Sequence, residues 1–273
     1  MAPDNSASDS GGVPRPGDTL QRNRQAFTAQ SAGFSSAGDT YADADDLAWM
    51  LAELPLSGAD RALDVATGTG ELARALAPRV ATVVGIDATE AMLEQGRRFV
   101  AQHGIENVHC EHGIVEALPF ESESFDVVAS RYAFHHFADP KPVLAEMARV
   151  CKPGGHLLIV DIVIPDEAMR GSYDYYEWLC DPSHVRCLGF EELRALVGLF
   201  GFDVTSARAR AIDESVLEWM EFSLTPDANR AEILGALRDE LAGGARTGLA
   251  PFERDGALYF EQRDAAVVGR RKG

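Results

Sequence analysis

Cysteines and long apolar runs are scarce in this chain of 273 residues. Its four cysteines, Cys110, Cys151, Cys180 and Cys187, form no Cys-x-x-Cys pair, so neither a disulfide framework nor a cysteine zinc site is expected, and reduced thiols fit better. No stretch approaches about 18 consecutive apolar residues, as a membrane-spanning helix requires. The first 25 residues hold no apolar segment typical of a signal peptide. We therefore expect a cytoplasmic protein.

Basic side chains are also few relative to acidic ones. Lys and Arg total 25 against 43 Asp and Glu, which gives a formal net charge of −18. Phosphate backbones and anionic lipid repel a chain this acidic, so nucleic-acid and membrane-surface roles are not expected. The sequence lacks both a P-loop and the Gly-x-Ser-x-Gly turn of serine hydrolases.

What the chain does have is a regular alternation of short apolar runs and helical periodicity. A polar tail, rich in Gly and Pro, is predicted to be disordered over residues 1–22, before one folded domain over 23–273. After an amphipathic helix at 43–54, strands are predicted at 62–66, 80–86, 107–112, 125–130 and 157–164, and helices at 71–77, 89–102 and 140–151. This order predicts a doubly wound, Rossmann-like α/β fold. Its parallel sheet should be covered on both faces, with the ligand outside the carboxyl ends of the strands.

The pattern changes after Pro165. Helical stretches over about 166–200 and 213–245 are interpreted as a cap inserted over the ligand edge of the sheet, with a strand at 202–209 between them. The last segment, 258–268, mixes polar and apolar residues and suits an edge or antiparallel strand. An exposed face of the helical insertion is a candidate for pairing two subunits in a homodimer.

The most informative stretch is LDVATGTGELA, residues 63–73, in which a predicted strand turns through glycines into a helix. Glycine permits close approach of a ligand to the backbone, and the helix N-terminus favours a negatively charged group. Asp87 ends the next strand, 19 residues after Gly68, where a carboxylate can accept hydrogen bonds from both hydroxyls of a ribose. The combination favours a cofactor that contains adenosine. Gly68-x-Gly70-x-x-Ala73 fits a nicotinamide dinucleotide as well as S-adenosylmethionine, and local geometry does not separate them.

Five blocks in order carry a resemblance to a known family. They are DVATGTG (64–70), VGID (84–87) followed by Met92-Leu93, EALPF (116–120), FDVV (125–128) and KPGG (152–155). Together they resemble the class I S-adenosylmethionine-dependent methyltransferases, in particular the UbiE-like small-molecule group called methyltransferase type 11. The resemblance implies a seven-stranded sheet with a reversed last strand and S-adenosyl-L-methionine as the cofactor.

The resemblance also implies roles for single residues. Gly68 and Gly70 would face the cofactor, Asp87 would hold its ribose, and Asp64 would lie near its ammonium group. Thr67 and Ala88 flank these residues and belong to the same expected site. Met92 would pack on the adenine, although a methionine at that helical position is equally compatible with plain core.

The adenine side departs from the family pattern. Relatives often carry an Asp after the position of Gly113, where it binds the adenine amino group, whereas this chain has Ile114. An isoleucine side chain cannot accept a hydrogen bond. Adenine recognition is therefore expected to depend on the backbone around Val115 or on Glu116.

Three histidines are the catalytic candidates. His135 and His136 follow the fourth predicted strand, where a histidine could take a proton near neutral pH, or could instead cap a helix and pack. His184 follows Asp181 by three residues, which suits a base and its orienting acid, or simply a turn in which Asp181 caps the backbone. Arg131 is expected either to bind the cofactor carboxylate or to pair with a neighbouring acid.

Two further expectations concern metal and access. No metal site is expected, because adjacent histidines diverge from an extended backbone and His109 and His112 would point to opposite faces of a strand. Phe27 and Phe34 are candidates for a lid over the cofactor, or for ordinary packing of an N-terminal helix.

The function expected from these observations is transfer of a methyl group from S-adenosylmethionine to an O, N or C atom of a small-molecule metabolite. Nucleic-acid methylation is disfavoured, because the charge is unsuitable and no Asn/Asp-Pro-Pro-Tyr segment occurs. Two alternatives remain: an NAD(P)-dependent oxidoreductase that uses the same glycine turn, and a protein that binds S-adenosylmethionine but assists a cyclisation or rearrangement without methylating.

Overall fold

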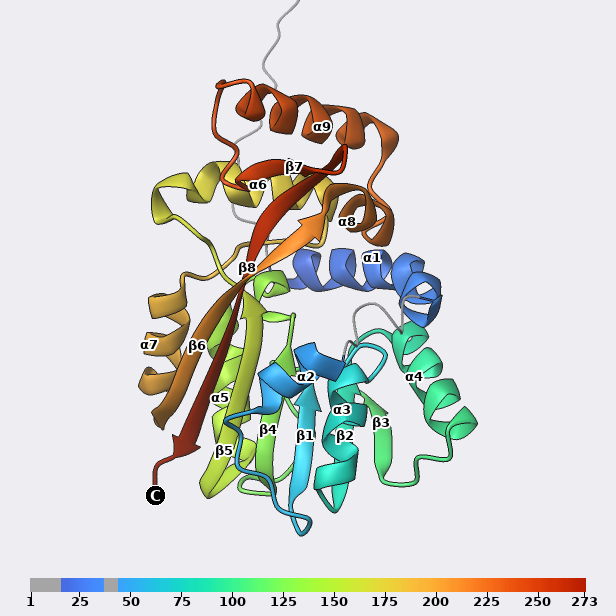
Figure 1. Ribbon diagram of the computed structural model, residues 1–273. Coiled ribbons are helices and arrows are strands. Elements are labelled where there is room, and N and C mark those ends of the chain that lie inside the picture. The colour runs from blue at the N-terminus through green and yellow to red at the C-terminus, as the bar shows by residue number, and fades with distance from the viewer. Residues whose placement is uncertain (1–15, 37–43) are drawn as a thin grey trace, which may run out of the picture.

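A mixed β-sheet with helices on both faces forms the centre of the computed structural model, which describes residues 16–36 and 44–273 (Figure 1). The strand order is β3-β2-β1-β4-β5-β8-β6, and β7 pairs with β8. Strands β1 to β5 run parallel, whereas β8 is antiparallel to both β5 and β6. The strands are β1 (Arg61–Val65), β2 (Thr82–Asp87), β3 (Val108–His112), β4 (Phe125–Arg131), β5 (Cys151–Ile162), β6 (Phe202–Ser215), β7 (Pro251–Arg254) and β8 (Ala257–Arg271). The predicted parallel sheet with a reversed last strand is confirmed, and the short hairpin strand β7 makes it eight strands rather than seven.

Two apolar layers enclose the sheet. One face packs against α5 and α7, and the other against α2 and α3. The helices are α1 (Pro16–Ser36), α2 (Ala44–Leu51), α3 (Glu71–Leu76), α4 (Glu90–Gln102), α5 (Pro140–Val150), α6 (Arg170–Cys180), α7 (Phe190–Leu199), α8 (Val216–Phe222) and α9 (Asp227–Leu241), with 3₁₀ turns η1 (Ala77–Arg79), η2 (Phe134–His136) and η3 (Glu167–Met169). No helix within residues 16–36 and 44–273 is both long and apolar enough to cross a membrane.

The N-terminal region corrects one prediction. Residues 16–22, expected to be disordered, form the first turns of α1, while residues 1–15 lie outside the described part. Pro16 suits the first position of a helix because its missing N–H has no partner there in any case. The helix is stabilised by tertiary packing, in which Thr19 is buried and Phe27 lies edge-to-face on His136, and composition alone does not reveal such packing.

The second half of the chain differs from the predicted cap in two places. Helix α7 lies on the sheet, where Leu193, Leu196 and Val197 join the core, so it covers a face of the sheet rather than the ligand edge. Strand β6 continues to Ser215 and takes the first residues of the predicted insertion. Helices α6, α8 and α9 do gather beyond the carboxyl end of the sheet, at the top of Figure 1, and enclose an apolar cluster of their own.

Exposed aromatic side chains lie on α6, where Tyr175 and Trp178 are both half-exposed. They belong to the helical region that the sequence suggested for pairing two subunits. A homodimer stays a prediction.

Candidate functional site

A cavity of about 820 Å³ lies at the carboxyl ends of β1, β2, β4 and β5, between the sheet, α1 and α8. In an open α/β sheet this edge is where ligands bind. Of the residues that the sequence singled out, the cavity is lined by Asp64, Thr67, Gly68, Asp87, Ala88, Met92, Val115, Glu116, Arg131, His135, His136 and His184. Gly70 is not among the lining residues.

The turn after β1 is fixed to the end of β2 through one carboxylate. Asp87 Oδ2 accepts a hydrogen bond from the Gly68 backbone N–H at 2.9 Å, and its Oδ1 accepts one from the Thr89 N–H at 2.8 Å. Gly68 has φ +56°, in the left-handed region that favours glycine. Burial raises the pKa of Asp87, against the lowering effect of these two N–H groups. A carboxylate has about four acceptor positions, so acceptor capacity remains for a ligand beside these two N–H groups and the Thr89 hydroxyl.

Asp64 organises the same turn from the other side. Its Oδ2 accepts hydrogen bonds from Thr67 Oγ1 at 2.6 Å and from the Ala73 N–H at 3.0 Å, inside the first turn of α3. Burial raises its pKa to about 7. Gly70 adopts φ +83° as the N-cap of α3, where it turns the backbone into the helix; its expected contact with the cofactor stays a prediction.

Close packing of α4 holds this turn from behind. A Cβ added to Gly96 would come within 2.8 Å of the Thr69 carbonyl oxygen, which belongs to the backbone of the turn. We expect Gly96→Ala to destabilise the fold by about 1–3 kcal/mol through this clash. As a matched control, Gly235→Ala on α9 meets nothing within 4 Å and should stabilise by about 0.5–1 kcal/mol through helix propensity. Urea unfolding measures the free energy of unfolding of both variants. A Gly96→Ala protein more stable than the wild type would show that the backbone of the turn shifts to accommodate the added Cβ.

Two residues that directly follow strands of the sheet, and that lack glycine's freedom, are held in the left-handed region at the cavity wall. Ala66, directly after β1, has φ +56°, and Tyr132, directly after β4, has φ +50°. Such conformations cost about 1–3 kcal/mol each and persist where the surroundings over-determine them, which is common at functional sites. Tyr132 is held by its hydroxyl, which donates to Asp264 at 2.6 Å.

The part of the cavity where adenine is expected is apolar and offers few hydrogen-bonding side chains. Met92 and Val115 are buried in the lining, and Glu116 also lines the cavity. Ile114 is 44% exposed and lies outside the lining. The position that carries an Asp in many relatives therefore contributes nothing to this cavity.

Arg131, at the end of β4, forms an ion pair with Glu71 at the start of α3, with 2.5 Å between Nη1 and Oε2. Both side chains are largely buried. Of the two roles expected for this arginine, the structure shows the pairing with a neighbouring acid.

The three candidate histidines lie together, each with a different partner. His135 Nδ1 is 2.5 Å from Asp161 Oδ1, and Asp161 also accepts from the Phe134 N–H. Burial lowers the pKa of His135 to about 3 and raises that of Asp161 to about 7, because both side chains lose hydration. Burial therefore opposes the charged form of each group.

His136 is the histidine best placed to act on a ligand. Its Nδ1 lies 3.1 Å from Ser183 Oγ, which donates its own proton to Asp181 Oδ1 at 2.6 Å. A hydroxyl has one hydrogen, so this pattern assigns the imidazole proton to Nδ1 and leaves Nε2 as an acceptor. The hydrogen bonds that hold this ring come from Ser183, and the imidazole itself lines the cavity.

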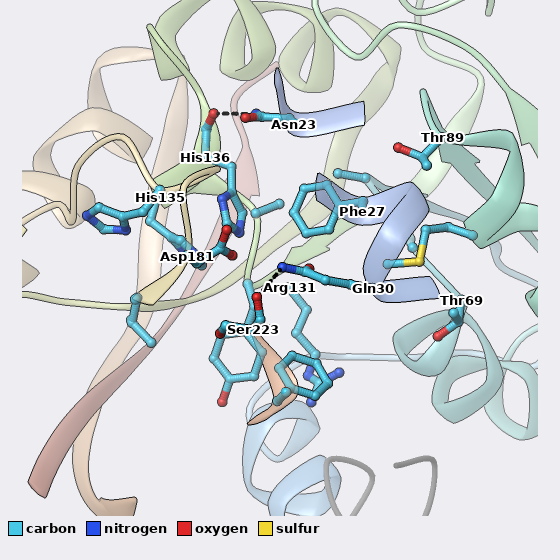
Figure 2. A pocket seen from close by; sticks show the side chains of 18 of the residues that line it. Asn23, Phe27, Gln30, Thr69, Thr89, Arg131, His135, His136, Asp181 and Ser223 are labelled. Atoms are coloured by element: carbon cyan, nitrogen blue, oxygen red, sulfur yellow. Dashed lines mark hydrogen bonds between the residues drawn. The ribbon is translucent and has the colours of Figure 1, made fainter. Parts of the chain in front are cut away.

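Helix α1 covers this histidine. Asn23 donates to the His136 carbonyl at 2.8 Å, and Gln30 reaches across to the Ser223 carbonyl next to α8. Figure 2 shows Phe27 between His136 on one side and Thr69 and Thr89 on the other. Phe27 thus lies where the predicted lid would be, whereas the side chain of Phe34 lies outside the described part.

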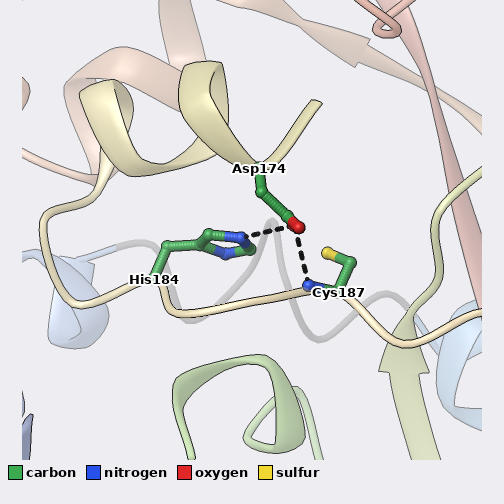
Figure 3. Close-up of side chains that lie close together, drawn as sticks. All are labelled: Asp174, His184 and Cys187. Carbon is green, nitrogen blue, oxygen red and sulfur yellow. Dashed lines mark hydrogen bonds and ion pairs between the residues drawn. The ribbon is translucent and has the colours of Figure 1, made fainter. Parts of the chain in front are cut away.

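His184 has a different partner from the one predicted. Its Nε2 lies 3.0 Å from Asp174 Oδ1 on α6, and the same oxygen accepts from the Cys187 N–H at 2.9 Å (Figure 3). Asp181 instead accepts from the Ser183 N–H and turns the backbone. Of the two alternatives for Asp181, the structure shows the turn, because the Asp181 carboxylate is directed toward Ser183 and not toward His184.

Asp174, His184 and Cys187 also place three potential metal ligands within 4.8 Å of one another. The carboxylate is already engaged by two N–H groups, and the Arg170 guanidinium lies 4.0 Å from it while donating to the Cys187 carbonyl. Burial holds the pKa of the Cys187 thiol well above its ordinary value. The structure favours a pair that orients His184 over a cation site.

The depressed pKa of His136 has a measurable effect on stability. Burial and the neighbouring His135 lower it from 6.5 to about 3, so between these pH values the unfolded chain binds a proton that the folded chain does not. The contribution of His136 to the free energy of unfolding is fully present above pH 6.5 and falls by about 1.4 kcal/mol per pH unit below it. We expect His136→Asn to lose this dependence. Urea unfolding measures the free energy of unfolding of both proteins from pH 7 to pH 4.5, and the wild type should lose stability relative to the variant as the pH falls. An equal dependence on pH in the two proteins would contradict a buried, uncharged His136.

Comparisons with known proteins agree with this geometry. Residues 63–159 match the family described as a methyltransferase domain. The chain is 30% identical over 169 residues to the ubiquinone/menaquinone biosynthesis C-methyltransferase UbiE of Teredinibacter turnerae, which covers 59% of this chain and 68% of that protein. It belongs to the class I S-adenosylmethionine-dependent methyltransferases.

A second relative has a solved structure. The uncharacterized methyltransferase YcgJ of Bacillus subtilis is 37% identical over 157 residues, which cover 57% of this chain and 62% of YcgJ, or somewhat less than two thirds of its length. The crystal structure of YcgJ matches with a TM-score of 0.76 and 28% identity over 84% of this chain and 99% of that chain. The Rossmann-like methyltransferase fold is thereby confirmed.

Several residues of the site were missed by sequence reasoning. Asp161 ends an apolar strand, and an acid at that place in the pattern would have identified it. Asp174 and Glu177 are three residues apart, which places them on one side of α6. Asn23 and Gln30 lie in a segment whose composition gave no indication of a site.

Proposed function

We propose that this chain transfers the methyl group of S-adenosylmethionine to an O, N or C atom of a small molecule. The observation that carries the proposal is the joining of the Gly68 turn to the Asp87 carboxylate at the mouth of a large cavity. Family membership supports the cofactor, and the acceptor atom of His136 supports a reaction at the opposite end of the cavity.

The side chains around the turn after β1 fit the parts of S-adenosylmethionine. Asp87 keeps acceptor capacity for ribose hydroxyls, and Met92 and Val115 offer an apolar surface to a purine. Asp64 supplies a carboxylate near the start of α3 for the ammonium group. When bound, S-adenosylmethionine supplies a methyl group on a positively charged sulfur, which is open to attack by a nucleophile.

The protein's own contribution is position, exclusion of water and a proton acceptor. Helix α1 and the region of α8 enclose the cavity, and Phe27 separates the histidines from the turn after β1. Holding two reactants in line can account for much of the acceleration of a displacement. Asp64 and Asp87 would hold the methyl donor, and His136 Nε2 would accept the proton that a hydroxyl or amine acceptor loses as it is methylated.

The low pKa of His136 limits which nucleophiles it can serve. An imidazole with a pKa of about 3 is uncharged throughout the physiological range, so its acceptor atom is always available. A hydroxyl that has gained a methyl group is a far stronger acid than an imidazolium and still gives up its proton to this histidine. Asp181, through Ser183, stabilises the charge that the histidine then carries.

An isotope screen tests the proposal. Purified protein is incubated with a small-molecule cell extract and S-adenosylmethionine labelled in its methyl group, and the products are examined by mass spectrometry. We expect one metabolite to gain a labelled methyl group while S-adenosylhomocysteine accumulates. Turnover of a metabolite without label would indicate a cyclase or rearrangement, and tight NAD(P) binding in a parallel titration would indicate an oxidoreductase.

A further inference from the structure

His135 and Asp161 form a hydrogen-bonded pair at the wall of the cavity. His135 Nδ1 lies 2.5 Å from Asp161 Oδ1, and Asp161 Oδ2 accepts the Phe134 N–H at 2.5 Å. Only 11% of the His135 side chain and 3% of the Asp161 side chain are exposed. A carboxylate at Nδ1 places the ring hydrogen on that nitrogen and makes Nε2 an acceptor.

Backbone contacts fix the position of His135. Its carbonyl accepts the N–H groups of Val185 and Arg186 at 2.9 and 3.1 Å. The side chain lines the cavity, whereas Asp161, which belongs to β5, is not among the lining residues. The centroids of the His135 and His136 rings are 3.9 Å apart. The pair therefore lies directly beside the histidine to which the proposed transfer gives the proton.

The two adjacent histidines differ in the group that each meets through Nδ1. His136 meets the Ser183 hydroxyl, whereas His135 meets a carboxylate. Burial raises the pKa of Asp161 to about 7, while burial and the neighbouring His135 lower that of His136 to about 3. Two ionisable groups in such close contact titrate as a unit. Near neutral pH a proton that arrives on His136 is therefore held more firmly by the pair next to it.

Other titratable groups surround the pair. They come from η2, from α6 and from the segment after α6: His136, Asp174, Asp181, His184 and Cys187. Burial has the largest effect on the pKa of His135; after it, His184 lowers that pKa, and Asp181 and Asp174 raise it. The two acids thus favour the presence of a proton on this side of the cavity.

We propose that His135 and Asp161 take up the proton that the methyl acceptor loses, and that Asp161 is the positioning residue that keeps His135 Nε2 an acceptor. The inference rests on the proposed methyl transfer. The proton leaves an O–H or N–H group of the methyl acceptor for His136 Nε2 and passes on to His135 Nε2. His135 then yields its Nδ1 hydrogen to Asp161 Oδ1. The pair has gained one proton, and both imidazoles are again uncharged.

The position of the ring hydrogen on His135 tests the pair without any methyl acceptor. Protein labelled with ¹⁵N in its histidines is titrated from pH 5.5 to pH 8.5 and followed by NMR. The ring resonances of His135, assigned by comparison with His135→Asn, report which nitrogen carries the hydrogen. We expect the hydrogen on Nδ1 above about pH 7 and on Nε2 below it, because Asp161 then holds the added proton.

Asp161→Asn provides the decisive comparison. Its amide nitrogen would donate to His135 Nδ1 while its oxygen still accepts the Phe134 N–H, so the ring hydrogen should lie on Nε2 at every pH. Glu191→Gln removes an exposed charge that pairs with Arg194, and this control should titrate as the wild type does. A ring hydrogen that stays on one nitrogen throughout in the wild type, or that changes position in Asp161→Asn, would overturn the inference. Neither result depends on the identity of the methyl acceptor.

The rate of transfer then tests the role of the pair. With the acceptor found by the isotope screen and saturating S-adenosylmethionine, wild-type kcat should fall about tenfold per pH unit below about pH 7, where the pair already holds a proton. Asp161→Asn should lower kcat by about 10²–10⁴ and lose this pH dependence, with unchanged affinity for S-adenosylmethionine. A variant that loses stability but keeps the wild-type kcat and pH profile would overturn the proposal. Absence of any labelled product would count against the proposed function itself, and the titration of His135 distinguishes the two failures.

Discussion

Replacing Asp87 with alanine is expected to weaken binding of S-adenosylmethionine by at least about a hundredfold. The carboxylate would lose two hydrogen bonds to ribose hydroxyls, each worth about 1.5–3 kcal/mol to a charged acceptor, and about 1.4 kcal/mol corresponds to a factor of ten. It would also release the Gly68 and Thr89 N–H groups that it now holds, so the turn after β1 would lose its fixed position. Isothermal titration calorimetry measures the effect.

Two controls make the result specific. Asp87→Asn keeps one acceptor oxygen and should bind with intermediate affinity. Asp203→Ala removes an exposed acid at the opposite end of the sheet and should bind as the wild type does. A folded Asp87→Ala protein with wild-type affinity would show that the cofactor lies elsewhere.

His136→Asn is expected to lower kcat by about 10²–10⁴ without changing the affinity for S-adenosylmethionine. The asparagine amide can take the place of Nδ1 beside Ser183 but has no atom at the position of Nε2, so only the proton acceptor is lost. The rate is measured with the acceptor found by the isotope screen.

A structural role for His136 would give a different outcome. If the histidine only packed against Phe27, the variant would lose stability but keep kcat. Ser183→Ala provides a graded comparison, because it leaves the imidazole in place and removes its link to Asp181; we expect a smaller fall in kcat.

The sheet and its glycine turn follow from local sequence, which is why they could be predicted. The strands of the parallel part are short runs of buried apolar residues, and the turn after Asp64 needs glycine wherever the sequence has it. Both features are encoded within a few residues. The spacing from Gly68 to Asp87 equally reflects one strand-helix-strand unit, and the structure joins these two residues by a hydrogen bond.

The histidine network could be predicted only in part, because its partners come from distant segments. Each imidazole was found from its position after a strand or in a turn, but Asp174 reaches His184 from helix α6. The start of α1 was missed for a related reason: a polar helix is stabilised by the surface on which it lies, here His136 and Ser223, and its own composition resembles a tail.

A crystal grown with S-adenosylhomocysteine tests the central claim most directly. We expect the nucleoside between the Gly68 turn and Met92, with both ribose hydroxyls within hydrogen-bonding distance of the Asp87 carboxylate and the sulfur directed toward His136. Density for the compound at another place, or none in this cavity at saturating concentration, would contradict it.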